Sequence, residues 1–253
     1  MELISPLTFV YTFYTSPLTF IPNFYPHLRP LNQPSSLLAL FFLTHYLNRA
    51  IISPLRTPSR NKSHIIVPLS ALAFNSVNGF LMGTYLSSPA ARYFLAGAFR
   101  RPGFWIGLGI AVLGFAGNIA HDEILFNIRR NAKAKQSQGK KTTTAKMEDS
   151  KHSKSQAQKE HYAVPYGLLY TYISYPNYFC EWLEWFGFAL AAAPPPTFTS
   201  GSLILLATLT PPWLFFFSEV WLMLPRALKG HRWYQERFAD YPRERRAVIP
   251  WVL

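Results

Sequence analysis

Six long apolar runs divide this chain of 253 residues. They lie at about 5–25, 37–54, 64–86, 104–128, 166–190 and 201–224. A helix of about 20 apolar residues is long enough to cross the hydrocarbon core of a bilayer. A helix also satisfies its own backbone hydrogen bonds, which lipid cannot do. The sequence therefore predicts an all-α polytopic transmembrane bundle of about six or seven spans, folded as one domain over residues 1–253.

The first apolar run is the least regular. Pro6, Pro17 and Pro22 interrupt it, and each proline removes a backbone donor. Membrane helices tolerate proline only where neighbouring groups satisfy the freed carbonyl. The sequence of this run is compatible with a complete span and with a broken or partial helix.

The charges lie in the segments between the runs. Charged residues make up only 15% of the chain, and its net charge is +13. The basic segments 56–62, 129–161 and the tail from Arg226 fall on one side of six spans, which the positive-inside rule assigns to the cytosol. Loop 191–199 on the opposite side is uncharged, although loop 87–103 carries three arginines. Because no nucleic-acid module surrounds these charges, we expect no nucleic-acid partner.

Segment 131–160 has too little apolar surface to fold by itself, and its composition predicts a disordered basic insertion.

Glycines recur at helical spacing inside the runs. Gly79 with Gly83, and Gly103 with Gly107, match the small-residue pattern of close membrane helix contacts. The run GLGIAVLG at 107–114 faintly resembles a dinucleotide-binding loop, but no strand precedes it. We interpret these glycines as sites of helix packing.

Polar residues are set into the fifth run, NYFCEWLEWFGFAL at 177–190. On a helix, Asn177, Glu181 and Glu184 share one face, and Tyr170 and Ser174 extend it. Polar groups are costly in lipid, so this face must meet other polar groups or a cavity.

Other runs carry matching stripes. Asn118, Asp122 and Arg129 lie on one face of the run 104–128 and its end. Further polar pairs are Tyr46 with Arg49, and Asn75 with Asn78. Structural hydrogen bonds between helices, each worth about 0.6–2 kcal/mol, could explain one stripe. Several stripes with carboxylates and arginine favour a polar pocket that opens to the cytosol.

The residue types in these stripes suit a nucleotide. Arginine binds phosphate, carboxylates accept from ribose hydroxyls, and asparagine can bind a carboxamide. A dinucleotide beside an entrance for an apolar substrate fits this composition.

Three motifs carry a family resemblance: GNIAHDEILFNIRR (117–130), YAVPYGLLYTYISYPNYFCEWLEWFGFAL (162–190) and HRWYQERFADYPRERRAVIPWVL (231–253). In these motifs the chain resembles the steroid 5-alpha-reductase family, or 3-oxo-5-alpha-steroid 4-dehydrogenases. The resemblance implies a catalytic region at about 104–253 in a multi-pass protein of the endoplasmic reticulum membrane. It also implies NADPH as cofactor, no metal, and reduction of the C4–C5 double bond of a 3-oxo-4-ene steroid taken from the bilayer.

The resemblance also implies roles for single residues. Tyr46 matches the tyrosine that binds the substrate ketone, and Glu2 matches its glutamate partner, a protonated acid. The implied cofactor contacts are Asn118, Asp122, Arg129, Tyr162, Asn177, Glu181, His231 and Tyr234, with Arg56 and Arg60 as phosphate ligands. Glu184 is expected behind the site. The resemblance begins at Met1, where relatives carry a further apolar segment, so we expect a short or truncated chain.

Several alternatives stay open. Enoyl-CoA and polyprenol reductases use the same cofactor and a related fold, and a non-catalytic scaffold is a further possibility. An isoprenylcysteine-type methyltransferase is disfavoured because SYPNY at 174–178 replaces the expected Arg-His-Pro. A di-iron hydroxylase needs clustered histidines, and the seven here never pair at ligand spacing. We therefore expect His45 and His121 to be held structurally.

Overall fold

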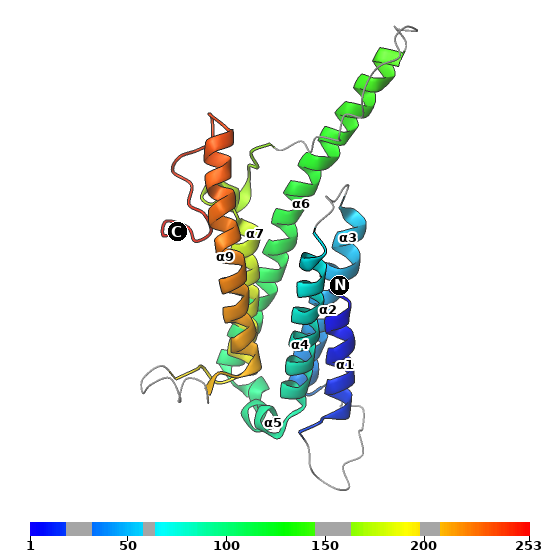
Figure 1. Cartoon of the computed structure of the whole chain (residues 1–253). Coiled ribbons are helices and arrows are strands. Elements are labelled where there is room, and N and C mark those ends of the chain that lie inside the picture. Colours follow the sequence, from blue (N-terminus) through cyan, green and yellow to red (C-terminus); the bar gives the residue numbers. More distant parts are fainter. Residues whose placement is uncertain (19–31, 58–63, 145–162, 198–207) are drawn as a thin grey trace.

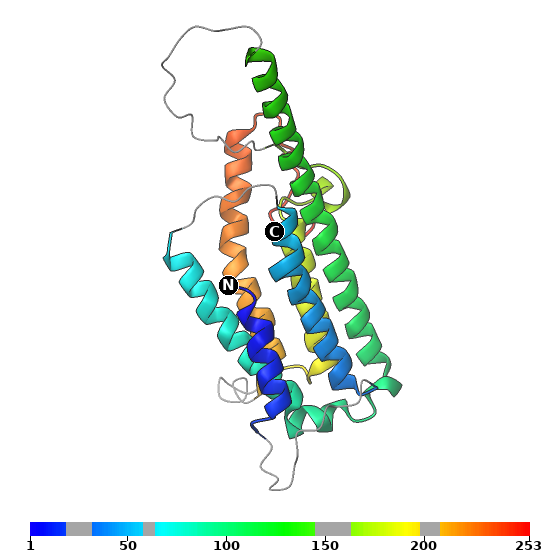
Figure 2. The same cartoon turned by 90° about the vertical axis from the view of Figure 1, so that its right-hand side faces the viewer.

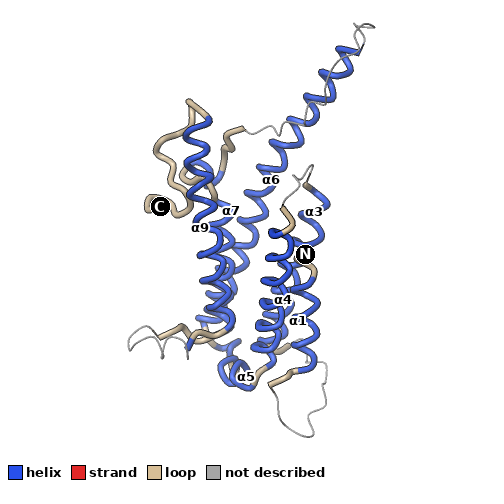
Figure 3. The backbone as a smooth tube through the Cα atoms, viewed as in Figure 1, coloured by secondary structure: helices blue, strands red, loops and turns tan. Residues whose placement is uncertain are grey.

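A computed structural model describes residues 1–18, 32–57, 64–144, 163–197 and 208–253, with the backbone alone for 135–144 (Figure 1). The elements in these parts are helices, and no strand occurs among them (Figure 3). One isolated parallel bridge joins Ile173 and Arg246. The expectation of an all-helical fold is confirmed.

The elements follow one another in a simple order. They are α1 (Ile4–Thr15), α2 (Pro34–Leu47), the π-helical turn η1 (Asn48–Ile52), α3 (Ser53–Arg56), α4 (Ile66–Ser87), α5 (Pro89–Leu95), the 3₁₀ turn η2 (Ala98–Arg100), α6 (Pro102–Thr144), the 3₁₀ turn η3 (Leu168–Thr171), α7 (Pro176–Ala192) and α9 (Pro211–Arg237). The long helices run side by side along a common direction in both views (Figures 1 and 2).

Three helices within the described ranges are long and apolar enough to cross a membrane. They are Pro34–Arg56, which joins α2, η1 and α3, then Ile66–Ser87, and the Pro102–Ala134 part of α6. Large apolar side chains on these helices point outward, as Leu69 and Leu113 do. The chain is therefore a membrane-type helical bundle, and the total of six or seven spans stays a prediction.

Two predicted spans have different bounds from those expected. The helix predicted at 166–190 begins at Pro176, because Gly167 adopts a positive φ of 99° and proline favours the first turn of a helix. The residues before it form η3 and an irregular connection. The last described helix begins at Pro211 and continues to Arg237, past the expected end at residue 224, and residues 201–207 lie outside the described residues.

The first run forms a short helix within its described part. α1 ends at Thr15, where Ser16 takes the left-handed conformation and Pro17 follows. A proline disfavours the helical conformation of the residue before it, which explains this end. The remainder of the run, with Pro22, lies outside the described residues.

The predicted disordered insertion is wrong for residues 131–144. They continue α6 to Thr144. The sequence after Arg130 is rich in alanine, lysine and glutamine, which favour helices, and extension of an existing helix needs no new nucleus. Residues 145–160 lie outside the described part of the chain.

Glycines bring two helix pairs into close contact. A Cβ at Gly79 would lie 2.1 Å from the Ser5 carbonyl oxygen, so α4 lies directly against α1. A Cβ at Gly114 would lie 2.4 Å from the Glu184 backbone nitrogen, and Gly107 makes a similar approach to α7. The packing role predicted for Gly79, Gly107 and Gly114 is confirmed, whereas Gly103 meets nothing within 4 Å.

Candidate functional site

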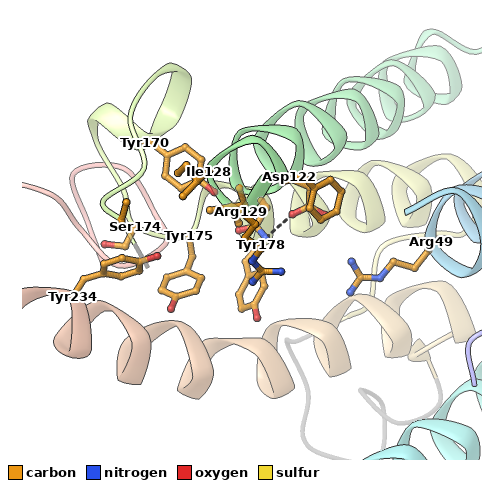
Figure 4. A pocket seen from close by; sticks show the side chains of 13 residues that line it. Arg49, Asp122, Ile128, Arg129, Tyr170, Ser174, Tyr175, Tyr178 and Tyr234 are labelled. Carbon is orange, nitrogen blue, oxygen red and sulfur yellow. Dashed lines mark hydrogen bonds between the residues drawn. The ribbon is translucent and has the colours of Figure 1, made fainter. Parts of the chain in front are cut away.

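The two predicted polar stripes face each other across α6 and α7. The Asn118 amide donates to the Asn177 carbonyl at 3.0 Å and to Glu181 Oε2 at 3.2 Å. The Asn177 amide donates to Asp122 Oδ1 at 3.0 Å (Figure 4). These bonds between helices confirm that the polar faces meet.

A cavity of about 340 Å³, here called the large cavity, opens beside this contact. Its walls come from η1, α6, the segment 163–178 and α9 (Figure 4). The polar side chains that line it are Arg49, Asp122, Arg129, Tyr170, Ser174, Tyr175, Asn177, Tyr178 and Tyr234. Two guanidinium groups, a carboxylate and four phenol rings make it a polar, aromatic site of a size common for ligands.

The C-terminal tail holds the irregular wall of the large cavity. Ser174 N donates to Arg246 O at 2.9 Å, and Tyr175 N donates to Ala247 O at 3.0 Å. Arg245 is 2% exposed, donates to the Pro165 carbonyl at 3.0 Å and lies over the Tyr166 ring. The tail therefore fixes the backbone that carries Tyr170, Ser174 and Tyr175.

His231 lies behind this wall and does not line the large cavity. Its Nδ1 is 2.5 Å from Ser174 Oγ, which is also 2.6 Å from the Tyr241 hydroxyl. Burial, and then the nearby Arg246 guanidinium, lower the pKa of His231. Tyr234 does line the cavity and stacks on Tyr241 with a centroid distance of 5.4 Å. Of these two predicted contacts, only Tyr234 faces the cavity.

A second cavity, of about 90 Å³ and here called the small cavity, is lined by the turn before α1 and by α2, η1, α4, α7 and α9. Its lining residues are Glu2, His45, Tyr46, Arg49, Phe74, Asn75, Glu181, Phe215 and Glu219. Both residues that the sequence predicted as catalytic, Tyr46 and Glu2, are among them. Arg49 lines both cavities, so the two cavities adjoin at its side chain.

The hydroxyl of Tyr46 is positioned to donate. Tyr46 is 4% exposed, and its hydroxyl oxygen accepts a hydrogen bond from the Asn78 amide at 2.8 Å. A phenol hydroxyl has one proton and can both accept and donate. With Asn78 supplying the bond that it accepts, its proton is available to a group in the small cavity.

Carboxyl groups outnumber guanidinium groups around the small cavity. Arg49 Nε lies 3.6 Å from Glu2 Oε1, and Glu181 and Glu219 line the same space. Arg49 belongs to the π-helical turn η1, a rare distortion that often occurs at functional sites. Glu219 was not among the predicted site residues. It is the only charged residue in the predicted span 201–224, and an ionisable group inside a span was the signal that could have identified it.

His45 and Glu184 form a buried pair beneath the small cavity. Their Nδ1 and Oε1 atoms are 2.6 Å apart, and Glu184 is fully buried. Glu184 lines neither cavity, and its expected place behind the site stays a prediction. The imidazole of His45 lines the small cavity directly beside Tyr46.

The remaining predicted residues lie apart from the cavities or outside the described chain. Arg56 donates to Glu123 Oε2 at 2.5 Å and lines neither cavity. Asn118 also lies behind the cavity walls, where it positions Asn177 and Glu181. Arg60 and Tyr162 lie outside the described residues.

Comparison with known proteins identifies relatives along most of the chain. A family model described as 3-oxo-5-alpha-steroid 4-dehydrogenase matches residues 140–253. An uncharacterized protein of Schizosaccharomyces pombe is 38% identical over 263 residues, which cover 100% of this chain and 82% of that protein.

Two relatives carry enzyme names. A steroid 5-alpha-reductase of Gossypium hirsutum is 31% identical over 230 residues, covering 87% of this chain and 71% of the relative. A 3-oxo-5-alpha-steroid 4-dehydrogenase 1 of Rattus norvegicus is 29% identical over 234 residues, covering 90% and 74% respectively. By these matches, the chain belongs to the steroid 5-alpha-reductase family.

Proposed function

We propose that this protein is a membrane-embedded oxidoreductase that uses NADPH to reduce the C4–C5 double bond of a 3-oxo-4-ene steroid. The observation that carries the proposal is the junction of the two cavities at Arg49. One is polar and aromatic, as a nucleotide requires, and the other contains the buried hydroxyl of Tyr46. The names of the family relatives supply the reaction class.

The side chains of the large cavity fit a phosphorylated dinucleotide. Arg49 and Arg129 would bind phosphate oxygens, because guanidinium groups form paired bonds to phosphate. Asp122 would accept from a ribose hydroxyl, and the Asn177 amide that orients it would face the same ligand. Tyr234 and its neighbouring phenols offer flat surfaces for a base or a nicotinamide ring.

Tyr46 is proposed to activate the substrate. NADPH, when bound, supplies the hydride that reaches the β carbon, C5. Negative charge then develops on the 3-ketone oxygen, and the Tyr46 hydroxyl would donate a hydrogen bond to that oxygen. Preorganised donors in a site without water stabilise such charge strongly. Asn78 would hold the phenol in the donating orientation.

The other predicted residues have supporting roles in this proposal. Glu2 lines the small cavity as the second group near the ketone, and its pair with Arg49 would fix the guanidinium at the junction. Glu181 would link the two sites, since it lines the small cavity and accepts from Asn118. Arg60 and Tyr162 complete the proposed cofactor-binding set. Asn118 and His231 would act from behind the cavity by positioning Asn177 and Ser174, and Arg56, which is paired with Glu123, is left out of the set.

The proposed setting is the endoplasmic reticulum membrane, with several spans and the large cavity facing the cytosol. The basic segments between the apolar runs support this orientation. An apolar steroid would enter from the bilayer, where it partitions, while the charged cofactor would enter from water.

Product analysis tests the proposed function. Membranes containing the protein are incubated with NADPH and, separately, 3-oxo-4-ene steroids, a polyprenol and an enoyl-CoA, and products are identified by mass spectrometry. We expect a mass increase of two hydrogens in a 3-oxo-4-ene steroid, and no product with NADH. Reduction of only the polyprenol or the enoyl-CoA would replace the steroid proposal with that related activity. No reduction of any compound would contradict it.

A further inference from the structure

The reduction of an enone needs a proton as well as a hydride, and the residues so far assigned do not supply it. Hydride at the β carbon moves the π electrons of the double bond onto the α carbon and the ketone oxygen. A proton must then form the new C–H bond at the α carbon. Tyr46 is proposed at the oxygen, so a second group must serve the carbon.

The pair of His45 and Glu184 has the geometry of an oriented proton donor. Glu184 Oε1 lies 2.6 Å from His45 Nδ1, and both side chains are buried. A carboxylate on Nδ1 fixes the tautomer and direction of an imidazole, as in catalytic triads. Because Glu184 occupies Nδ1, Nε2 is the ring nitrogen left for a ligand in the small cavity.

Aromatic rings hold the imidazole in place. The His45 ring meets the Trp185 ring edge to face at 4.7 Å between centroids, and the Tyr46 ring at 5.1 Å. Its neighbour in sequence, Tyr46, lines the same cavity. A substrate that receives the Tyr46 hydrogen bond at its ketone would therefore carry its α carbon into the neighbourhood of His45.

We propose that His45 is the catalytic acid that protonates the α carbon, C4, and that Glu184 is its positioning residue. This inference rests on the proposed function. The pair holds one proton shared between Nδ1 and Oε1 and a second on Nε2. The Nε2 proton passes to C4 as the electron pair of the enolate forms the C–H bond. Water then restores the proton to Nε2.

The charged groups around the small cavity are compatible with this role. Glu2, Glu181 and Glu219 bring three carboxyl groups against the single guanidinium of Arg49. The imidazole, paired with Glu184, lies against these carboxyl groups. Loss of its proton at the moment of reaction leaves the Tyr46 hydrogen bond to the oxygen intact.

The substitution His45→Asn tests the proposal, with His64→Asn as its matched control. His64 is exposed just before α4 and lines neither cavity. We expect His45→Asn to lower turnover by about 10²–10⁴-fold, the usual contribution of an acid catalyst. The solvent deuterium isotope effect should rise, because proton transfer becomes slower than hydride transfer. The control should match the wild type.

A second readout does not depend on hydride transfer. In D₂O without NADPH, the wild-type protein should exchange the C4 hydrogens of the saturated 3-oxo steroid, because the residue that delivers this proton can also remove it. His45→Asn should lose this exchange. Glu184→Gln keeps a hydrogen-bonding group against Nδ1 without the charge, and it should slow both exchange and turnover by at least about tenfold. If His45→Asn does not fold, Glu184→Gln tests the role of the His45–Glu184 pair.

The outcomes separate this inference from the proposed function. A wild-type protein that reduces no compound overturns the proposed function. A wild-type protein that reduces the steroid, alongside variants with unchanged turnover, isotope effect and exchange, overturns the role of His45 alone. Turnover that is lost in His45→Asn while C4 exchange continues would make His45 a structural residue.

Discussion

The two cavities differ in wall, charge and position, although they share Arg49. The large cavity lies where α6 and α9 meet the irregular segment 163–178, and tyrosines and two arginines line it. The small cavity lies between helices from both ends of the chain, with three carboxyl groups and a buried tyrosine. In the proposed function, the large cavity holds the cofactor and the small cavity acts on the ketone end of the substrate.

The two cavities are formed largely by different parts of the sequence. Most of the large cavity comes from the C-terminal half of the chain, in and around the region matched by the family model. The small cavity also needs Glu2, Tyr46 and Asn75 from the N-terminal part of the chain. Cofactor binding should therefore depend on the C-terminal half, and chemistry on the contact between the two halves.

The sharpest test of this division is Tyr46→Phe, for which we expect the largest effect. Loss of the hydroxyl should lower turnover by about 10²–10³-fold, as for other donors to a developing oxyanion. The rise in melting temperature caused by NADPH should not change. Tyr85→Phe is the matched control, because the Tyr85 hydroxyl donates to the Ala192 carbonyl away from both cavities. Unchanged turnover in Tyr46→Phe would show that the substrate ketone is not activated in the small cavity.

The contact between α6 and α7 should influence both cavities together. In Gly114→Ala the new Cβ would lie 2.4 Å from a backbone nitrogen of α7, so the helices must separate. Overpacking of this kind costs about 1–3 kcal/mol, and we expect a lower melting temperature with weaker NADPH binding and slower turnover. Gly109→Ala, where nothing lies within 4 Å, should leave all three unchanged or raise stability slightly.

Substitution of two neighbouring arginines distinguishes direct cofactor binding from a general effect of surface charge. Arg129 lines the large cavity, whereas Arg130 pairs with Glu123 outside it. Arg129→Ala should raise the Kd for NADPH by about 10- to 100-fold, because a charged hydrogen bond is worth about 1.5–3 kcal/mol. Isothermal titration of the purified protein measures this. Equal effects of Arg129→Ala and Arg130→Ala would point to general electrostatic attraction.

The smallest expected effect is that of Asn177→Ala. It removes the hydrogen bond from the Asn177 amide to Asp122 but leaves the Asp122 carboxylate in the large cavity, so the Kd for NADPH should rise only a fewfold, with turnover at saturating NADPH retained. Asn127→Ala on the exposed face of α6 is the control. A fall in turnover at saturating NADPH would mean that Asn177 acts in the small cavity as well.

Helical periodicity was sufficient to predict the polar contact between α6 and α7. Asn118, Asp122, Asn177 and Glu181 repeat at intervals that place them on single faces, and the hydrogen bonds between them follow. The packing glycines were also predictable, since lipid offers no other reason for paired small residues in an apolar helix.

Other features depend on contacts distant in sequence. The pairing of His45 with Glu184 joins residues 139 positions apart, and each alone is typical of a structural residue. In the sequence, Arg245 is one of several basic residues in the tail and nothing marks it as buried. In the fold, it is buried against the Pro165 carbonyl. The end of α6 was misjudged because segment 131–144 lacks apolar residues, although a helix already formed in the membrane can continue into water.

The most direct measurement traces the hydrogen atom that is transferred from NADPH, proposed to bind in the large cavity, to the steroid in the small cavity. Membranes containing the protein are incubated with a 3-oxo-4-ene steroid and NADPH that carries deuterium in both C4 positions of the nicotinamide. We expect a saturated ketone with one deuterium at C5 and a solvent hydrogen at C4. A steroid that stays unreduced while NADPH binds, or a saturated ketone without deuterium, would contradict it.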